Sequence, residues 1–343
     1  MAVTIYDIAE RAGVSIATVS RVLNNHRRVA DRTRRRVLSI ADDLGYQPHA
    51  SAQSLARRQT RLVSVVLPMM TNYFFVEVMR SLQEYLAEHE FDLLVHASAT
   101  LDGVDAQLDR AVQKGLSDGI LLFSTPTTEA RTQRLRRCGR PVVLVDCAHP
   151  GFDSVTTDNQ AGGYLATRCL LDLGRRRIAL LMANPASVPS KDRAAGYRRA
   201  LCDAGLVADE RLIAVSTDDA EHGYTEYGGY VSMQRLLAHS DDRPDAVFAT
   251  SDVQALGALR AIQEHGLQVP HDIALIGFDD IQISRYVGLT TLRQPMAEIG
   301  RQAAKLVLQR IEAPERPSSQ TVFAPRLIHR STTQTGTTNG VGP

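Results

Sequence analysis

Two patterns of hydrophobic and polar residues follow one another along this chain, and the change between them lies near residue 61. Before it, apolar residues recur every three or four positions over short stretches, which predicts helices. From Leu62 onward, short continuous apolar runs alternate with amphipathic stretches, which predicts buried strands alternating with helices. The pattern therefore predicts a small all-α head followed by an α/β body.

The first two predicted helices are separated by a short turn. Thr4 and Asp7 have nearly the spacing and residue types of a capping box, and Gly13 is a helix end signal. Ser15 is the expected N-cap of a second helix over about 16–24. Two short helices joined by a tight glycine-containing turn predict a helix-turn-helix.

A third helix is predicted over about 31–44, and together the three helices can close a small core. Ala30 stands at the cap position of this helix and has no side-chain acceptor. The missing cap costs about 1 kcal/mol unless Asp31 serves instead. The apolar stripe of the helix consists of Val37, Ile40, Ala41 and Leu44.

In the body, seven apolar runs predict strands. They lie at 62–68, 91–97, 118–124, 141–146, 177–183, 245–250 and 272–278. Helical stretches between them predict parallel sheets with helices on both faces. The series divides near 158–162 into two similar halves. We therefore expect two doubly wound parallel-sheet lobes, with ligands at the carboxyl ends of the strands in the cleft between them.

The charge is distributed unevenly along the chain. The net charge is +1, but residues 1–61 hold eleven arginines and only five acidic residues, so the rest of the chain is net negative. A basic head on a mildly acidic body favours contact with a polyanion such as DNA. The alternative is that these arginines belong to solvated helix faces.

Several protein classes lack support in the sequence. No run approaches the roughly 20 apolar residues of a membrane span, and the first residues do not resemble a secretory signal. The four cysteines have no paired spacing, which argues against a disulfide framework or a zinc site and fits a reducing cytoplasm. There is no phosphate-binding loop, dinucleotide fingerprint or hydrolase motif. We expect a cytoplasmic protein that is not an enzyme and needs no cofactor or metal.

Two segments of the head carry a resemblance to a known family. TIYDIAERAGVSIATVSRVLNN and RVADRTRRRVLSIADDLGYQPHASAQSLA resemble the LacI–GalR family of bacterial transcriptional repressors. Body segments such as DGILL, VTTDNQAGGYLATRCLLDLGRRRIALL and LTTLRQPMAEIGRQAAKLVL also resemble it, so the resemblance covers about residues 4–333. In that family the body looks like a periplasmic sugar-binding protein.

The resemblance implies a domain organisation. A helix-turn-helix domain is expected over 1–47, a hinge over 48–61, a ligand-binding body over 62–333 and a disordered tail over 334–343. In the family the chain crosses between lobes three times. Lobe one would therefore contain about 62–161 and 294–322, and lobe two about 162–291 and 323–333. The last long helix, near 298–311, would pack on lobe one.

The second helix is the expected DNA reader. Its outward side chains are small or polar and can enter a major groove, where an arginine can bind guanine. The family resemblance assigns base contacts to Ile16, Ala17 and Arg21. It also implies a hinge that becomes helical on the operator and inserts Leu55 into the minor groove, whereas a plain linker is the alternative. The expected DNA-binding residues are Thr4, Ser15, Ile16, Ala17, Thr18, Ser20, Arg21, Asn24, Asn25, Arg28, Ala52 and Leu55.

The resemblance also implies a set of ligand contacts. Arg193 would clamp hydroxyl or carbonyl groups with its fixed donors, and Asp279 would accept hydrogen bonds from hydroxyls. Core packing is the alternative for Tyr73 and Phe74, and helix capping for Asp252. The expected ligand-binding residues are Tyr73, Phe74, Ser124, Asp146, Arg193, Asp219, Asp252 and Asp279.

These features predict a ligand-responsive transcriptional regulator, most often a repressor in this family. The expected partners are palindromic operator DNA, a second copy of the chain in a homodimer and a sugar or nucleoside-like effector. When bound to its operator, the protein would be located at the bacterial nucleoid. A sugar-binding transport receptor and an enzyme on a doubly wound fold are the alternatives. The basic head argues against the first, and the missing catalytic motifs argue against the second.

Overall fold

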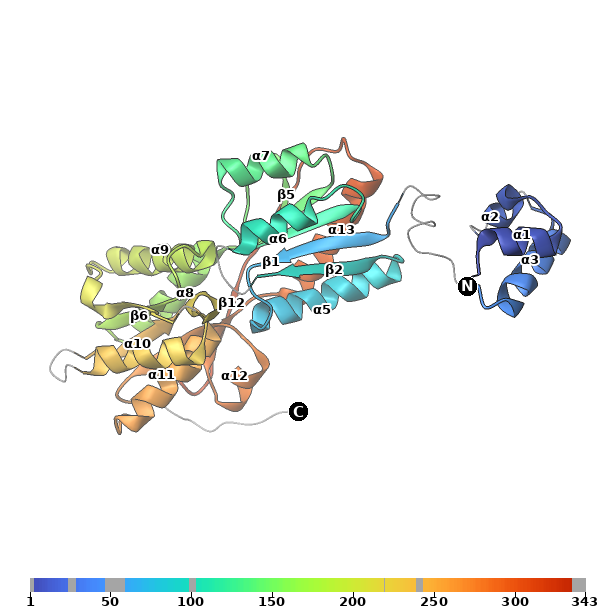
Figure 1. The fold of residues 1–343 in the computed structure, drawn as a ribbon. Helices are drawn as coiled ribbons and strands as arrows, with labels where there is room; N and C mark the ends of the chain where they lie inside the picture. Colours follow the sequence, from blue (N-terminus) through green and yellow to red (C-terminus); the bar gives the residue numbers. More distant parts are fainter. Residues whose placement is uncertain are drawn as a thin grey trace. The chain divides into compact units, whose positions relative to one another are not determined.

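The computed structural model describes residues 3–23, 29–46, 59–98, 103–218, 220–238 and 243–334. The chain divides into two compact units, Met1–Arg61 and Leu62–Pro343. Among the described residues, the first unit contains three helices, and the second unit is an α/β body with two lobes (Figure 1). Within the described ranges, no helix is both long enough and apolar enough to cross a membrane.

The head contains the predicted helix-turn-helix. Its helices are α1 (Ile5–Ala12), α2 (Ile16–Leu23) and α3 (Asp31–Asp43). The Asp7 carboxylate accepts hydrogen bonds from both the backbone nitrogen and the hydroxyl of Thr4, each at 2.7 Å. Gly13 ends α1 in the left-handed region, with φ 60°. The hydroxyl of Ser15 accepts from the backbone nitrogen of Thr18 at 3.2 Å and so caps α2.

The core of the head is small and purely apolar. Ala30 precedes α3 without a side-chain cap, as expected, and Asp31 does not replace it. Asp31 is instead the first residue of the helix, where its charge interacts favourably with the helix dipole. The buried residues of this core are Ile8, Ala9, Ala12, Val19, Val22, Val37 and Ala41.

Lobe one of the body is built on a parallel sheet of six strands. The strand order is β11-β5-β4-β3-β1-β2. The strands are β1 (Leu62–Leu67), β2 (Asp92–Ala97), β3 (Gly119–Phe123), β4 (Val142–Val145), β5 (Asp153–Thr157) and β11 (Gln320–Phe323). One face is covered by α5 (Tyr73–Glu88) and α13 (Met296–Glu312), and the other by α6 (Gly103–Ala111) and α7 (Glu129–Arg137).

Lobe two repeats this architecture. Its strand order is β12-β10-β9-β8-β6-β7, and β12 alone runs antiparallel to its neighbour. The strands are β6 (Ile178–Met182), β7 (Ile213–Val215), β8 (Ala246–Ala249), β9 (Ala274–Asp279), β10 (Thr290–Arg293) and β12 (Arg326–Ile328). One face is covered by α8 (Asn159–Asp172) and α9 (Val188–Asp203), and the other by α10 (Glu226–Leu237) and α11 (Asp252–Glu264). The short helix α12 (Gln282–Tyr286) follows β9.

The chain passes between the lobes three times. It leaves lobe one after β5, returns after β10 and leaves again between β11 and β12. As a result α13, which follows nearly all of lobe two in sequence, packs beside α5 on lobe one (Figure 1). This placement confirms the expectation for the last long helix.

Glycines bring pairs of helices in lobe two into backbone contact. A Cβ atom at Gly163 on α8 would lie 2.1 Å from the carbonyl oxygen of Arg193 on α9. Gly196 makes the reciprocal approach from α9, and Gly229 and Gly257 play the same parts where α10 crosses α11. Side chains at these positions would force the helices apart, so the glycines fix how closely each pair packs.

Candidate functional site

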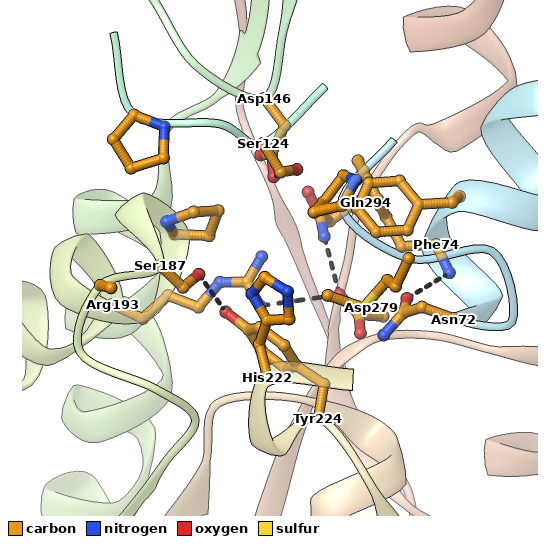
Figure 2. Close-up of a pocket in the computed structure, with 16 residues that line it drawn as sticks. Asn72, Phe74, Ser124, Asp146, Ser187, Arg193, His222, Tyr224, Asp279 and Gln294 are labelled. Carbon is orange, nitrogen blue, oxygen red and sulfur yellow. Dashed lines mark hydrogen bonds and ion pairs between the residues drawn. The ribbon is translucent and has the colours of Figure 1, made fainter. Parts of the chain in front are cut away.

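A cavity lies between the two lobes, where the strands of both sheets end. It encloses about 520 Å³ of space, including open solvent at its mouth. Its walls come from the segments that follow β1, β3 and β4 in lobe one, from those that follow β6, β7 and β10 in lobe two, and from the end of β9. In Figure 2 the labelled side chains of the two lobes point toward one another. Ligand sites of open parallel sheets lie at this edge.

Lobe one supplies an aromatic wall and a carboxylate. Phe74 and Phe75 line one side of the cavity. Ser124 and Asp146 follow β3 and β4, and both have left-handed backbones, with φ 42° and 58°. The Ser124 hydroxyl donates to Oδ2 of Asp146 at 2.6 Å. Burial raises the pKa of Asp146 to about 6.

Lobe two supplies a guanidinium group that is held on several sides. Arg193 is 3% exposed, and its Nε donates to Oδ1 of Asn159 at 2.8 Å. Its Nη1 donates to the carbonyl of Thr250 at 2.6 Å and lies 3.8 Å from Oδ1 of Asp279. The guanidinium carbon lies 3.7 Å from the ring centre of Phe278, a cation–π contact. Arg193 therefore has little freedom to turn.

Asp279 stands at the end of β9 and faces both Arg193 and the second crossing between the lobes. Its Oδ1 accepts from Nε2 of Gln294 at 2.7 Å. Burial raises the pKa of Asp279 to about 6, and the nearby Arg193 opposes that shift. Gln294 lies just beyond β10, where the chain returns to lobe one.

A segment of lobe two, residues 220–224, reaches over to lobe one, and we call it the strap. Three consecutive strap residues, Glu221, His222 and Gly223, have positive φ angles of 46°, 58° and 82°. The hydroxyl of Thr71 in lobe one donates to the carboxylate of Glu221. The strap is thus tied to the loop that follows β1.

Two other strap side chains line the cavity itself. The ring of His222 hydrogen-bonds the carbonyl of Pro68 in lobe one, and burial lowers the pKa of the ring, which favours its neutral form. Tyr224 packs against the apolar core of lobe one, and its hydroxyl lies 2.8 Å from that of Ser187 in lobe two. Both side chains therefore connect the two lobes.

The cavity contains buried polar atoms that the described residues leave unpaired. They are Oδ1 of Asp146, Nε2 of His222 and Oε1 of Gln294. Since the Pro68 carbonyl takes one N–H of the neutral His222 ring, we assign Nε2 as an acceptor. All three atoms then accept hydrogen bonds, and leaving buried acceptors unpaired costs free energy. A molecule with several donors would satisfy them.

The structure brings most of the predicted ligand residues to this cavity. Those that line it are Phe74, Ser124, Asp146, Arg193 and Asp279. Tyr73 does not line it, because it begins α5 instead of preceding the helix and is 48% exposed. Asp219 lies outside the described residues.

Asp252 is neither a cavity residue nor a helix cap. Its carboxylate accepts from the backbone nitrogen of Ile281 at 2.9 Å and from the hydroxyls of Ser284 and Thr291 at 2.7 and 2.5 Å. Ser251 caps α11 in its place. Asp252 therefore holds the start of α12 against β10, and burial raises its pKa to about 8.

The sequence did not single out several residues that line the cavity. They are Asn72, Ser187, His222, Tyr224 and Gln294, among others. His222 and Tyr224 lie in irregular backbone between elements, where periodicity carries no signal. The place of Gln294 beside the expected second crossing could have indicated its importance.

In the head, the predicted DNA residues on α2 present a polar surface. Ile16, Ala17 and Arg21 are exposed, whereas Ser20 is half-buried. The hydroxyls of Ser15 and Thr18 lie 2.9 Å apart. Thr4 serves the capping box of α1. The remaining predicted residues, Asn24, Asn25, Arg28, Ala52 and Leu55, lie outside the described residues.

Both parts of the chain match known protein families. Residues 4–49 match the model of bacterial regulatory proteins of the lacI family, and residues 167–333 match a periplasmic binding protein-like domain. The chain is 35% identical to the ribose operon repressor of Haemophilus influenzae, across 95% of this chain and 97% of that repressor.

Solved structures give the same result for the fold. The lac repressor dimer bound to operator and the anti-inducer ONPF matches with a TM-score of 0.85 at 26% identity, covering 97% of this chain and 99% of that one. A LacI family transcriptional regulator from Enterococcus faecium with bound ribose matches with a TM-score of 0.69 at 30% identity, covering 79% of this chain and 98% of that one.

Proposed function

The chain belongs to the lacI family of bacterial regulatory proteins, and from this premise we propose which residues contact DNA and what kind of molecule fills the cavity. The protein is a DNA-binding transcriptional regulator with a small-molecule effector. We propose that it represses transcription as a homodimer on a palindromic operator, and that its effector is a small, uncharged, polyhydroxylated molecule, a free pentose or hexose.

The exposed side chains of α2 support the proposed DNA contacts. Arg21 projects from a helix whose neighbouring outward residues, Ile16 and Ala17, are small enough or apolar enough to lie against bases. An arginine in the major groove can donate two hydrogen bonds to guanine, and an apolar group can contact a thymine methyl. We propose that these three residues read the operator.

Replacement of Arg21 tests this reading of DNA. Arg21→Ala should weaken binding to the specific operator by about 1–3 kcal/mol and relax the preference at one base pair in each half-site. Binding to random DNA should change much less, as measured by electrophoretic mobility shift at fixed salt. An equal loss on both DNAs would mean that Arg21 contacts only phosphate.

The three unpaired acceptors carry the proposal for the ligand. Oδ1 of Asp146, Nε2 of His222 and Oε1 of Gln294 each require a donor, and the hydroxyls of a sugar supply several. Phe74 and Phe75 give the carbon face of such a ring an apolar surface.

The charges around the cavity disfavour an anionic ligand. Its charged lining residues, within the described part of the chain, are Asp146, Arg193 and Asp279. Two carboxylates and one guanidinium repel a phosphate when all three are ionised, because buried charges are weakly screened. We therefore propose a free sugar and not a sugar phosphate.

A thermal-shift screen of the full chain tests the ligand class. Free pentoses and hexoses, beginning with D-ribose, should raise the melting temperature, whereas their phosphates and purine nucleosides should not. A sugar that raises it should also change the affinity for operator DNA, since an effector shifts the equilibrium by its differential affinity for two states. Stabilisation by a sugar phosphate or nucleoside alone would contradict the proposed class.

A further inference from the structure

A row of buried polar side chains runs through the cavity from lobe one to lobe two. Ser124 bonds Asp146 in lobe one, and Arg193 approaches Asp279 in lobe two. Asn159 is a neighbour of both pairs, since it hydrogen-bonds Arg193 and lies beside Asp146. It is 5% exposed and does not line the cavity itself.

Asn159 lies where the chain first crosses between the lobes. It is the first residue of α8, two positions after the end of β5. Its Nδ2 donates to the carbonyl of Thr157 at 3.3 Å, and its Oδ1 accepts from Nε of Arg193 at 2.8 Å. The Asn159 amide therefore connects Thr157, the last residue of β5 in lobe one, to the guanidinium of Arg193 in lobe two.

The same side chain also lies beside the carboxylate of lobe one. Asn159 helps to lower the pKa of Asp146, although burial dominates and Oδ1 of that carboxylate stays without a hydrogen bond. An amide can donate to one neighbour and accept from another without adding a charge.

We propose that Asn159 is a positioning residue that couples the ligand cavity to the crossing between the lobes, by holding Arg193 of lobe two and the end of β5 in lobe one with a single side chain. The inference rests on the proposed function, because it requires that a ligand contact Arg193 and Asp146. A rotation of one lobe against the other at this crossing must then stretch one of the two amide hydrogen bonds. Ligand contacts that fix Arg193 resist that rotation.

Two variants separate the two tasks of the amide. Asn159→Ala removes both hydrogen bonds, so the free sugar that stabilises the wild type, D-ribose first, should bind about tenfold or more weakly. The factor by which that sugar changes operator affinity should fall toward one. Asn159→Asp keeps the acceptor for Arg193, which also balances the new charge, but loses the donor to Thr157. It should keep more sugar affinity than Asn159→Ala, although the new charge lies beside Asp146, and still lose most of the coupling factor.

Thr167→Val is the matched control, because Thr167 is a fully buried residue of the same helix whose hydroxyl donates to the carbonyl of Gly163 at 2.9 Å. It should lower the melting temperature about as much as Asn159→Ala while leaving sugar affinity and coupling unchanged. The measurements are calorimetric sugar titration and operator binding with and without sugar, on the full chain.

Each result has one meaning. If no free sugar stabilises the wild type, the proposed ligand class is wrong and the inference loses its premise. If the wild type binds a sugar but Asn159→Ala behaves like Thr167→Val, the inference alone is overturned. Should Asn159→Ala not fold, the outcome for Asn159→Asp decides, because loss of coupling with retained affinity supports the proposal and retained coupling contradicts it.

Discussion

The two lobes of the body share one strand order but hold their cavity side chains by different means. In lobe two, Arg193 is on a helix pressed against α8 by glycines, and three further contacts fix its guanidinium. In lobe one, Ser124 and Asp146 are single residues at strand ends, with one short hydrogen bond between them. The guanidinium of Arg193 in lobe two is therefore placed by helix packing, whereas the carboxylate of Asp146 in lobe one is placed by a strand end and by burial.

The largest effect is expected when a methyl group is added where α8 packs against α9. Gly163→Ala would place a Cβ atom 2.1 Å from the backbone of Arg193, where no flexible side chain can move away. Overpacking usually costs about 1–3 kcal/mol, and we expect about 3 kcal/mol or more here because backbone must shift. Urea unfolding should show the loss, and sugar binding to the remaining folded protein should weaken too.

Lobe one offers a matched substitution. A Cβ at Gly300 on α13 would lie 2.2 Å from the carbonyl oxygen of Val78 on α5. Gly300→Ala should therefore destabilise the protein in a similar way but lower sugar affinity less than Gly163→Ala, since neither helix holds Arg193 and α5 contributes only the apolar side chains of Phe74 and Phe75. Equal losses of sugar affinity in both variants would abolish the distinction between the lobes.

The next effect concerns the carboxylate that faces Arg193. Asp279→Asn should weaken sugar binding by about 1.5–3 kcal/mol, the usual contribution of a hydrogen bond to a charged group. Operator affinity without sugar should change much less. Isothermal titration of the sugar found in the screen is the measurement, and an affinity within twofold of wild type would locate the ligand elsewhere.

Replacement of Asp146 should instead raise the stability of the protein at neutral pH. Its pKa is raised to about 6 in the folded protein, so the stability contributed by this group is complete below about pH 4 and is lost as pH rises through 6. Asp146→Asn cannot ionise and should be more stable than wild type by about 2 kcal/mol at pH 7.5. The difference should vanish near pH 4. Urea unfolding at both pH values checks this, and a difference independent of pH would argue against the burial of the charge.

The smallest expected effect is that of Ser124→Ala. It removes the 2.6 Å hydrogen bond to Asp146, which opposes the rise in the pKa of that carboxyl. We expect sugar binding to weaken by about 1 kcal/mol. The weakening should grow as pH falls toward 6, because more of the variant then carries a protonated Asp146. A titration series over pH 6–8 would show a flat difference if the hydrogen bond were unimportant.

The sequence was most informative where burial is continuous. The seven predicted strands are present to within about two residues at each end. Within the part of the chain that the structure describes, five further strands are present that were not predicted. They are β5, β7, β10, β11 and β12, of three to five residues each. In β5 the sequence DSVTT is mainly polar, so its burial depends on neighbours from distant parts of the chain.

The position of a cavity residue was predictable where that residue lies at the carboxyl end of an apolar strand. Asp146 and Asp279 follow apolar runs, and their placement at the cavity follows from sheet topology. Tyr73 does not line the cavity, because Asn72 caps α5 and Tyr73 is the exposed first residue of that helix. Asp252 carries the same chemistry as Asp279, but Ser284 and Thr291 bind its carboxylate, and neither partner is evident from local sequence.

The three crossings also determine when each lobe can be completed during synthesis on the ribosome. Lobe one is encoded first, but its α13 and β11 emerge only after almost all of lobe two has been synthesised. Until then the strand residues Leu121, Val143 and Val145 lack the α13 side chains that cover them in the finished protein. Lobe one thus begins before its neighbour and is completed after most of it, with part of an apolar sheet face uncovered in the nascent chain.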